Sequence, residues 1–113
     1  MMDERRMKAE LRPPVLVLER SAPRIVHDVG EMVRMATAQG RLRVEVRVSD
    51  AVSGEPLPAV VHLQGQRYPA NEPFEHLFES EFNAKSGQWS RELIWVEHRG
   101  YENIEVDYRV EVT

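Results

Sequence analysis

The stretch RLRVEVRV at residues 41–48 decides the fold class of this chain. Apolar residues occupy every second position and charged residues fill the positions between them, which is the period of a strand with one buried face. The stretch IEVDYRVEV at residues 104–112 repeats this alternation near the C-terminus. Together they predict a mainly β protein in which residues 41–113 form an antiparallel β-sandwich domain.

The outward positions of these two strands carry opposite charge. The first strand presents arginines and the second presents carboxylates, at Arg41, Arg43, Arg47 and at Glu105, Asp107, Glu111. Oppositely charged side chains on neighbouring strands stabilise a sheet by about 0.2–1 kcal/mol for each pair. We therefore predict that the two strands lie next to each other in one sheet.

Three further strands are expected between these two. Residues 59–63 are an apolar run of strand length, followed by turn residues. In residues 74–82 a phenylalanine recurs at every fourth position, which fits a helix or a strand, and the turn-rich surroundings favour a strand. Residues 88–96 are read as a strand that carries Trp89, Leu93 and Trp95 on one face.

Residues 1–40 carry a weaker pattern and are expected to form an N-terminal arm outside the sandwich domain. Residues 1–12 suit a short helix or a loose arm, and Val15–Leu18 is a four-residue apolar strand after two prolines. A capping-box spacing followed by apolar residues at helical spacing predicts one helix over residues 28–38. The alternation in residues 31–36 also fits a strand, and so short a pattern leaves both interpretations open.

Composition and charge restrict the class of protein. Hydrophobic residues make up 42% and charged residues 30%, which is typical of a soluble globular domain. Residues 51–113 contain five basic and eleven acidic residues, and an acidic sandwich disfavours nucleic-acid binding. The absence of cysteine excludes disulfides and thiolate metal sites. No signal peptide or membrane-spanning run is visible, so we expect a location in the cytoplasm or in a larger particle.

The segment VSDAVSGEPLPAVVHL at residues 48–63 resembles the first hairpin of the carboxypeptidase regulatory-like domains, which are prealbumin-like (transthyretin-like) and Ig-like sandwiches. FNAKSGQW at residues 82–89 and GYE at residues 100–102 resemble later landmarks of that family in the same order. The resemblance covers residues 41–112 and implies that Gly54 supplies a positive φ in the first loop. It implies no catalytic residue, and the Tyr-Arg-Gly-Ser ending of related transthyretin-like hydrolases is absent.

The histidines and glutamates were the remaining candidates for chemistry, and they lack the spacing of a metal or acid–base site. His76 shares a strand face with Phe74 and Phe78, so we expect it at the edge of the core. His62 alternates with inward aliphatic residues, so we expect it on the solvent side. The glutamates of residues 72–81 are expected to form a solvated face. The sequence therefore predicts no catalytic residue, no metal site and no cofactor.

The expected function is that of a non-enzymatic structural or protein-interaction module, a component of a larger assembly. The strand and helix of the N-terminal segment would either cover the sandwich edge of their own chain or add to a neighbour's sheet, and a protein partner or a second copy would bind through this segment. The candidate interaction residues are Val15, Leu16, Val17, Leu18, Met32, Tyr68, Trp95 and Tyr101. One alternative is a carbohydrate- or peptide-binding sandwich that uses a surface row of the three aromatic residues. Another is a small hydrolase of transthyretin-like type.

Overall fold

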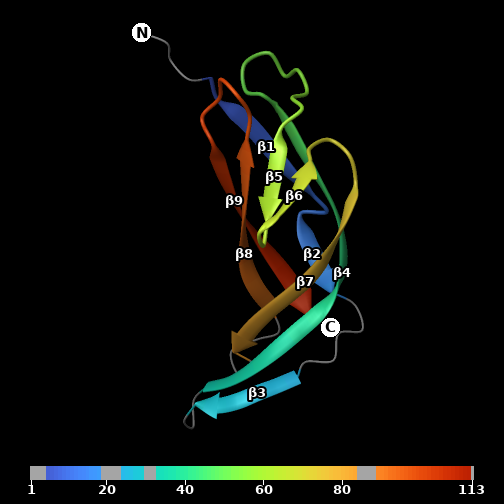
Figure 1. Ribbon diagram of the computed structural model, residues 1–113, viewed down its shortest axis with the longest axis vertical. Helices are drawn as coiled ribbons and strands as arrows, with labels where there is room; N and C mark the ends of the chain where they lie inside the picture. The colour runs from blue at the N-terminus through green and yellow to red at the C-terminus, as the bar shows by residue number, and fades with distance from the viewer. Residues whose placement is uncertain (1–4, 19–23, 30–32, 84–88, 113) are drawn as a thin grey trace.

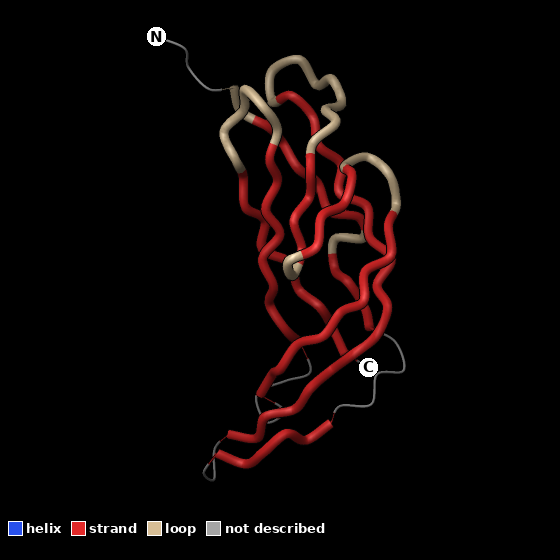
Figure 2. The backbone as a smooth tube through the Cα atoms, in the orientation of Figure 1, coloured by secondary structure: helices blue, strands red, loops and turns tan. Residues whose placement is uncertain are grey.

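The computed structural model describes residues 5–18, 24–29, 33–83 and 89–112, and these residues form nine β-strands and no helix. Two sheets enclose one core in an elongated molecule of 55 × 28 × 20 Å (Figures 1 and 2). The mainly β, sandwich-like class is confirmed. Within the described residues there is accordingly no helix of the length and apolarity that crossing a membrane requires.

The first sheet has four strands and is built around β4 (Val33–Asp50). Its partners, all antiparallel, are β1 (Met7–Arg12) at residues 45–50, β7 (Phe74–Asn83) at residues 35–44 and β3 (Arg24–Val29) at residues 33–37. Because β3 and β7 both pair with residues 35–37, they lie on opposite edges of β4. Figure 1 shows that β3 lies at one end of the long axis of the molecule.

The second sheet has five strands in the order β2-β9-β8-β5-β6. Their bounds are Val15–Leu18 (β2), Ile104–Val112 (β9), Trp89–Glu97 (β8), Val60–Leu63 (β5) and Gln66–Pro69 (β6). β2 runs parallel to β9, and the other neighbours in this sheet are antiparallel. The three strands expected over residues 59–63, 74–82 and 88–96 are confirmed, each to within one residue at either end.

The core is formed by the inward positions of the alternating strands. On β4 the aliphatic members of the alternation are buried, with 1–3% of their surface exposed: Leu42, Val44, Val46 and Val48. The second sheet contributes side chains without exposed surface to the same cluster: Val61, Leu63, Ile94, Val96 and Val110. Burying a valine or leucine side chain stabilises the folded state by about 1.5–3 kcal/mol. The alternation that predicted the strands therefore also determines which face of each sheet turns inward.

The N-terminal segment contributes one strand to each sheet. β1 extends the first sheet along β4, and after the cis Arg12–Pro13 peptide bond the chain continues as β2, which pairs with β9 in the second sheet. Side chains of both strands are buried in the common core: Met7, Leu11 and Leu16. The described part of this segment therefore closes one side of its own two-sheet fold.

Several expectations for the N-terminal segment can be compared with these strands. A helix or loose arm over residues 1–12 is wrong for residues 7–12, which are a strand because the backbone of β4 offers them hydrogen-bond partners. The strand Val15–Leu18 is confirmed. The domain boundary expected at residue 40 falls inside β4 and stays a prediction.

The helix expected over residues 28–38 is wrong. Residues 24–29 and 33–38 lie in strands β3 and β4, and the residues between them, which include the candidate Met32, lie outside the described part of the chain. The backbone of residues 35–37 is paired with β3 on one edge and with β7 on the other. Pairing between strands therefore replaces the hydrogen bonds of a helix, and the alternative strand interpretation holds from residue 33 onward.

The predicted pairing of strands 41–48 and 104–112 is also wrong, because β4 and β9 belong to different sheets. Two of the three arginines lie opposite glutamates of their own sheet instead, Arg47 opposite Glu10 and Arg43 opposite Glu75. An exposed ion pair contributes at most about 1 kcal/mol, less than the burial of one core side chain. The apolar faces therefore determine which strands become neighbours, and surface charge does not.

Candidate interaction surface

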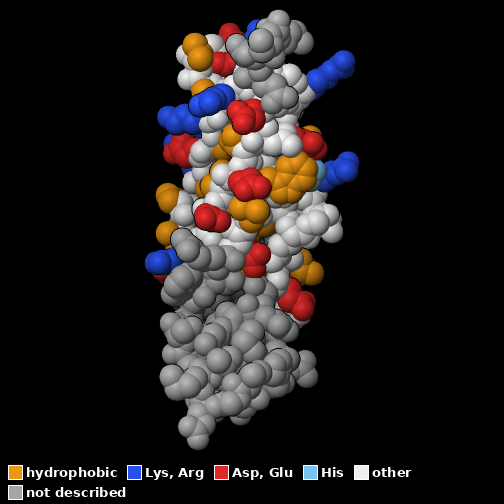
Figure 3. Space-filling model, turned by 90° about the vertical axis from the view of Figure 1, so that its left-hand side faces the viewer, with side chains coloured by type: hydrophobic (Ala, Val, Ile, Leu, Met, Phe, Trp, Pro, Cys, Tyr) orange, Lys and Arg blue, Asp and Glu red, His pale blue; other side chains and the backbone are white. Residues whose placement is uncertain are grey.

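The outer face of the five-stranded sheet combines acidic and apolar side chains. β9 runs between β2 and β8 and turns charged side chains outward, at Glu105, Asp107, Arg109 and Glu111. On β8, Leu93 and Trp95 lie opposite two of these residues in the register. On β2, Val15 and Val17 lie opposite the other two. We call these eight residues the mixed face. Figure 3 shows hydrophobic side chains among acidic and basic ones on the side where β9 lies in Figure 1.

Apolar side chains on the mixed face are unusually open to solvent. Leu93 is 46% exposed, Val15 39% and Val17 43%. They are three of the five large exposed apolar side chains in the described residues; the other two are Val52, in a loop, and Leu77, on the outer face of the other sheet. Single exposed apolar residues are normal on a monomer, whereas several on one face indicate a contact surface.

Trp95 is held in place by His62 on the neighbouring strand. The two residues are directly opposite in the register of β5 and β8, and their rings stack in parallel at a centroid distance of 3.6 Å and an angle of 3°. His62 Nε2 also donates to Glu97 Oε1 at 2.7 Å. His62 was expected on the solvent side; it does lie on the outer face but is only 9% exposed, because its ring stacks with the indole. The stack covers one side of the indole.

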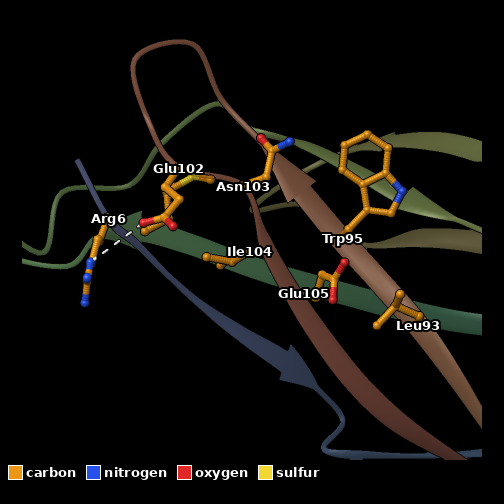
Figure 4. A pocket seen from close by; sticks show the side chains of 8 residues that line it. Arg6, Leu93, Trp95, Glu102, Asn103, Ile104 and Glu105 are labelled. Carbon is orange, nitrogen blue, oxygen red and sulfur yellow. Dashed lines mark ion pairs between the residues drawn. The ribbon is translucent and has the colours of Figure 1, made fainter. Parts of the chain in front are cut away.

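Trp95 also lines a groove of about 870 Å³ (Figure 4). We call it the Trp95 groove, and its lining residues are Arg6, Met7, Leu93, Trp95, Glu102, Asn103, Ile104 and Glu105. Figure 4 shows the tryptophan and Leu93 projecting from β8, with Ile104 and Glu105 on the adjacent β9. The Arg6 guanidinium Nε lies 3.8 Å from Glu102 Oε2, and both side chains are largely exposed. Acidic and apolar groups thus line one open depression.

Tyr101 has a structural role at one end of the molecule. Its hydroxyl donates to Asp50 Oδ2 at 2.6 Å, and Asp50 Oδ1 accepts from the backbone N–H groups of Val52 and Ser53. These hydrogen bonds lower the pKa of the Asp50 carboxyl to about 2, and the one from the tyrosine hydroxyl has the largest effect. Gly54, in the same loop, has a φ of 76°, as the resemblance implied. Tyr101 therefore fastens a loop and lies outside the mixed face.

Tyr68 belongs to a network that links the two sheets. Its ring stacks with Phe74 at 4.0 Å, and its hydroxyl lies 2.6 Å from His76 Nδ1. His76 Nε2 lies 2.7 Å from Gln64 Oε1, which can only accept, so Nε2 carries the proton and Nδ1 accepts from the tyrosine. His76 is 2% exposed, and burial lowers its pKa. The expectation that His76 shares the buried face of Phe74 and Phe78 is confirmed.

The structure separates the candidate residues that the sequence singled out. Val15 and Val17 reach the mixed face, whereas Leu16 is 1% exposed and lies in the core. Leu18 pairs through its backbone with Val112 at the end of β2, and Met32 lies outside the described residues. The three aromatic candidates occupy three different places, so they do not form a surface row.

Sequence reasoning missed Leu93, Glu105 and the role of His62. It placed Leu93 and Trp95 on one strand face without deciding whether this face turns outward. The buried residues Ile94 and Val96 occupy the other positions of β8, but Glu92 shares their face. Because both faces of this strand mix apolar and charged residues, alternation alone indicates only weakly which face turns outward.

No group of three or more metal-ligating side chains comes together in the part of the chain that the structure describes. No protein-family model, curated protein or solved structure matches this chain. The resemblance to the carboxypeptidase regulatory-like domains stays a prediction. The function is therefore inferred from the geometry of the site.

Proposed function

We propose that this protein is a non-enzymatic interaction module, a component of a larger assembly, and that it binds a protein partner through the mixed face. The observation that carries the proposal is the grouping of Val15, Val17 and Leu93 on this face, beside a partly exposed tryptophan. Tryptophan and neighbouring apolar side chains supply much of the binding energy in protein interfaces. The charged residues of β9 between them would give the interface its specificity.

The role of the N-terminal segment becomes narrower in this proposal. The sequence left open whether the segment covers the sandwich edge of its own chain or docks onto a partner. In the structure, β1 and β2 pair with strands of their own chain, so the contribution to binding comes from the side chains of Val15 and Val17. We also propose a prealbumin-like or Ig-like sandwich as the finer fold, supported by the positive φ of Gly54 and Gly100 in the loops that carry the resemblance.

The two alternative functions have less support. A carbohydrate-binding site would use several aromatic rings on one surface. Tyr68 is instead hydrogen-bonded to His76 and Tyr101 to Asp50, and both lie away from Trp95. A hydrolase would need a histidine that is open to substrate and joined to other polar side chains. His76 has such partners but is closed off by Tyr68 and Gln64. The only hydrogen bond of His98 within the described residues is to the backbone carbonyl of Arg99.

A matched pair of leucine variants tests the proposed function. Leu93→Glu places a charge in the mixed face, and Leu77→Glu makes the same change on the outer face of the other sheet, where the leucine is 73% exposed. Proteins retained by the immobilised full chain from its own cell type would be quantified by mass spectrometry. We expect a partner that wild type and Leu77→Glu retain and that Leu93→Glu binds at least about tenfold more weakly.

Circular dichroism and the denaturation midpoint would verify that both variants are folded. The proposal is overturned if folded Leu93→Glu retains the same proteins as wild type. It is also overturned if the wild type retains none above an empty matrix.

A further inference from the structure

The Trp95 groove carries an excess of negative charge. Glu102 and Glu105 line it, and Asp107 follows on the same face of β9. Among the described residues its lining contains one cation, Arg6, which already lies 3.8 Å from Glu102. Glu105 has no ion-pair partner within the described part of the chain. The groove therefore favours a cationic occupant and disfavours an anionic one.

The Trp95 indole lines the groove, and in the described part of the chain it is stacked with the imidazole of His62 on one side only. Glu105 lines the same groove and is directly opposite Trp95 in the register of β8 and β9. Opposite side chains on neighbouring strands have Cβ atoms about 4.5–5.5 Å apart. A flat cation stacked on the indole would therefore be within reach of that carboxylate.

An arginine side chain satisfies these conditions better than a lysine side chain. The guanidinium group is planar, stacks on aromatic rings and matches a carboxylate with two parallel donors, whereas an ammonium group is compact and strongly hydrated. The aliphatic stem of an arginine would pack against the apolar lining formed by Leu93 and Ile104. The groove thus offers a separate surface for each part of this side chain.

We infer that the Trp95 groove receives an arginine side chain from a segment of the partner protein. This inference rests on the proposed function, because it names the chemistry of the partner at the same face. Charge complementarity supports a basic segment: the carboxylates of Glu102 and Glu105 line the groove, and Glu105 is without an ion pair in the described residues. His62 acts here as a positioning residue that fixes the plane of the indole.

Three short peptides that differ at one position would test the inference. The probes are acetylated and amidated Thr-Val-X-Val-Thr, in which X is arginine, lysine or citrulline; citrulline keeps the shape of arginine and lacks its charge. Each is titrated into the isotope-labelled full chain, and the indole N–H signal of Trp95 is followed by NMR. This signal is assigned as the one that disappears in Trp95→Phe, since the chain has two tryptophans. We expect the arginine peptide to shift it most and the citrulline peptide least.

Charge variants locate the binding energy. Glu105→Gln should weaken the binding of the arginine peptide by about fivefold, because the substitution removes the carboxylate opposite the indole. Glu75→Gln is the matched control, an exposed glutamate on the outer face of the other sheet, and should leave the affinity unchanged. Added salt should weaken the binding of the arginine peptide to the wild type, and it should weaken the binding to Glu105→Gln much less.

The outcomes separate this inference from the proposed function. Equal shifts with the arginine and citrulline peptides, or no shift at millimolar peptide, overturn the inference. In that case a partner that only Leu93→Glu fails to retain would still support the interaction module. Shifts of the Trp95 signal on dilution of the chain without peptide would identify a second copy as the occupant and overturn the inference as well. If the arginine peptide binds and no partner depends on Leu93, the groove is confirmed and the module is overturned.

Discussion

Two histidine clusters in this protein use similar residues in opposite surroundings. His76 is 2% exposed and joins Tyr68 and Gln64, so that both of its ring nitrogens are bonded across the two sheets. His62 lies on the outer face, where one nitrogen bonds Glu97 and the ring supports Trp95. The inner cluster is closed, whereas the outer one includes an indole that lines an open groove. Position relative to the sheets, more than residue type, therefore determines what a histidine contributes.

The largest effect is expected from removing the inner histidine. His76→Ala leaves a cavity and deprives the Tyr68 hydroxyl of its acceptor, so the free energy of unfolding should fall by about 2–4 kcal/mol. Denaturant unfolding at neutral pH measures this change. Glu75→Ala, at the exposed neighbouring position of β7, is the control and should change stability by less than about 0.5 kcal/mol. Equal losses in both variants would contradict a special role for the inner cluster.

The inner cluster should also make stability depend on pH. Burial lowers the pKa of His76 in the folded protein, so below about pH 6.5 the unfolded chain binds the proton more readily. Stability from this residue is therefore complete above that pH and is lost as the pH falls toward the lower folded pKa. Glu92 opposes this effect, because its charge favours the protonated imidazole.

Unfolding curves between pH 7 and pH 5 would measure this dependence, with His76→Gln as the comparison. The wild type should lose stability more steeply than the variant over this range. The Asp50 carboxyl, whose pKa is about 2, is protonated only at lower pH. It should therefore leave the difference in stability between the two proteins unaffected over this range. Parallel curves would show that the histidine is not responsible.

Smaller effects, opposite in sign to each other, are expected from removing the hydroxyl groups of the buried Tyr108 and the half-buried Tyr68. Tyr108 is 3% exposed, and its hydroxyl has no hydrogen-bond partner within the described residues, whereas the hydroxyl of Tyr68 is bonded to His76. Tyr108→Phe should leave stability unchanged or raise it by up to about 1 kcal/mol, and Tyr68→Phe should lower it by about 1 kcal/mol. A loss in both variants would mean that the Tyr108 hydroxyl is also satisfied in solution.

The parts of the fold that could be predicted are those determined by burial. The alternation at residues 41–48 and 104–112 gave the strands and their inward faces, because one buried face leaves a period of two in the sequence. Which strands pair could not be read from their surface charges, since burial outweighs them. The helix over residues 28–38 failed because strands β3 and β7 bind the backbone of β4 from both edges, and this is tertiary information.

The candidate surface was predictable only in part. Val15, Val17 and Trp95 were singled out from the sequence as candidates, and all three lie on the mixed face. Their association could not be foreseen, because it requires β2 to pair with β9, more than 90 residues away in the chain. The stack of His62 on Trp95 likewise depends on the register of β5 and β8.

Only a small effect on stability is expected from the outer histidine. His62→Ala removes a ring stack and a hydrogen bond to the half-exposed Glu97, interactions that together contribute about 0.5–1 kcal/mol. Its larger consequence should be on the groove, because the indole of Trp95 loses the ring that fixes its plane. We expect the arginine peptide to bind His62→Ala about threefold more weakly, and His62→Phe, which keeps a stacking ring, to recover most of the loss. A stability loss as large as that of His76→Ala, with unchanged peptide binding, would mean that the outer cluster also serves only the fold.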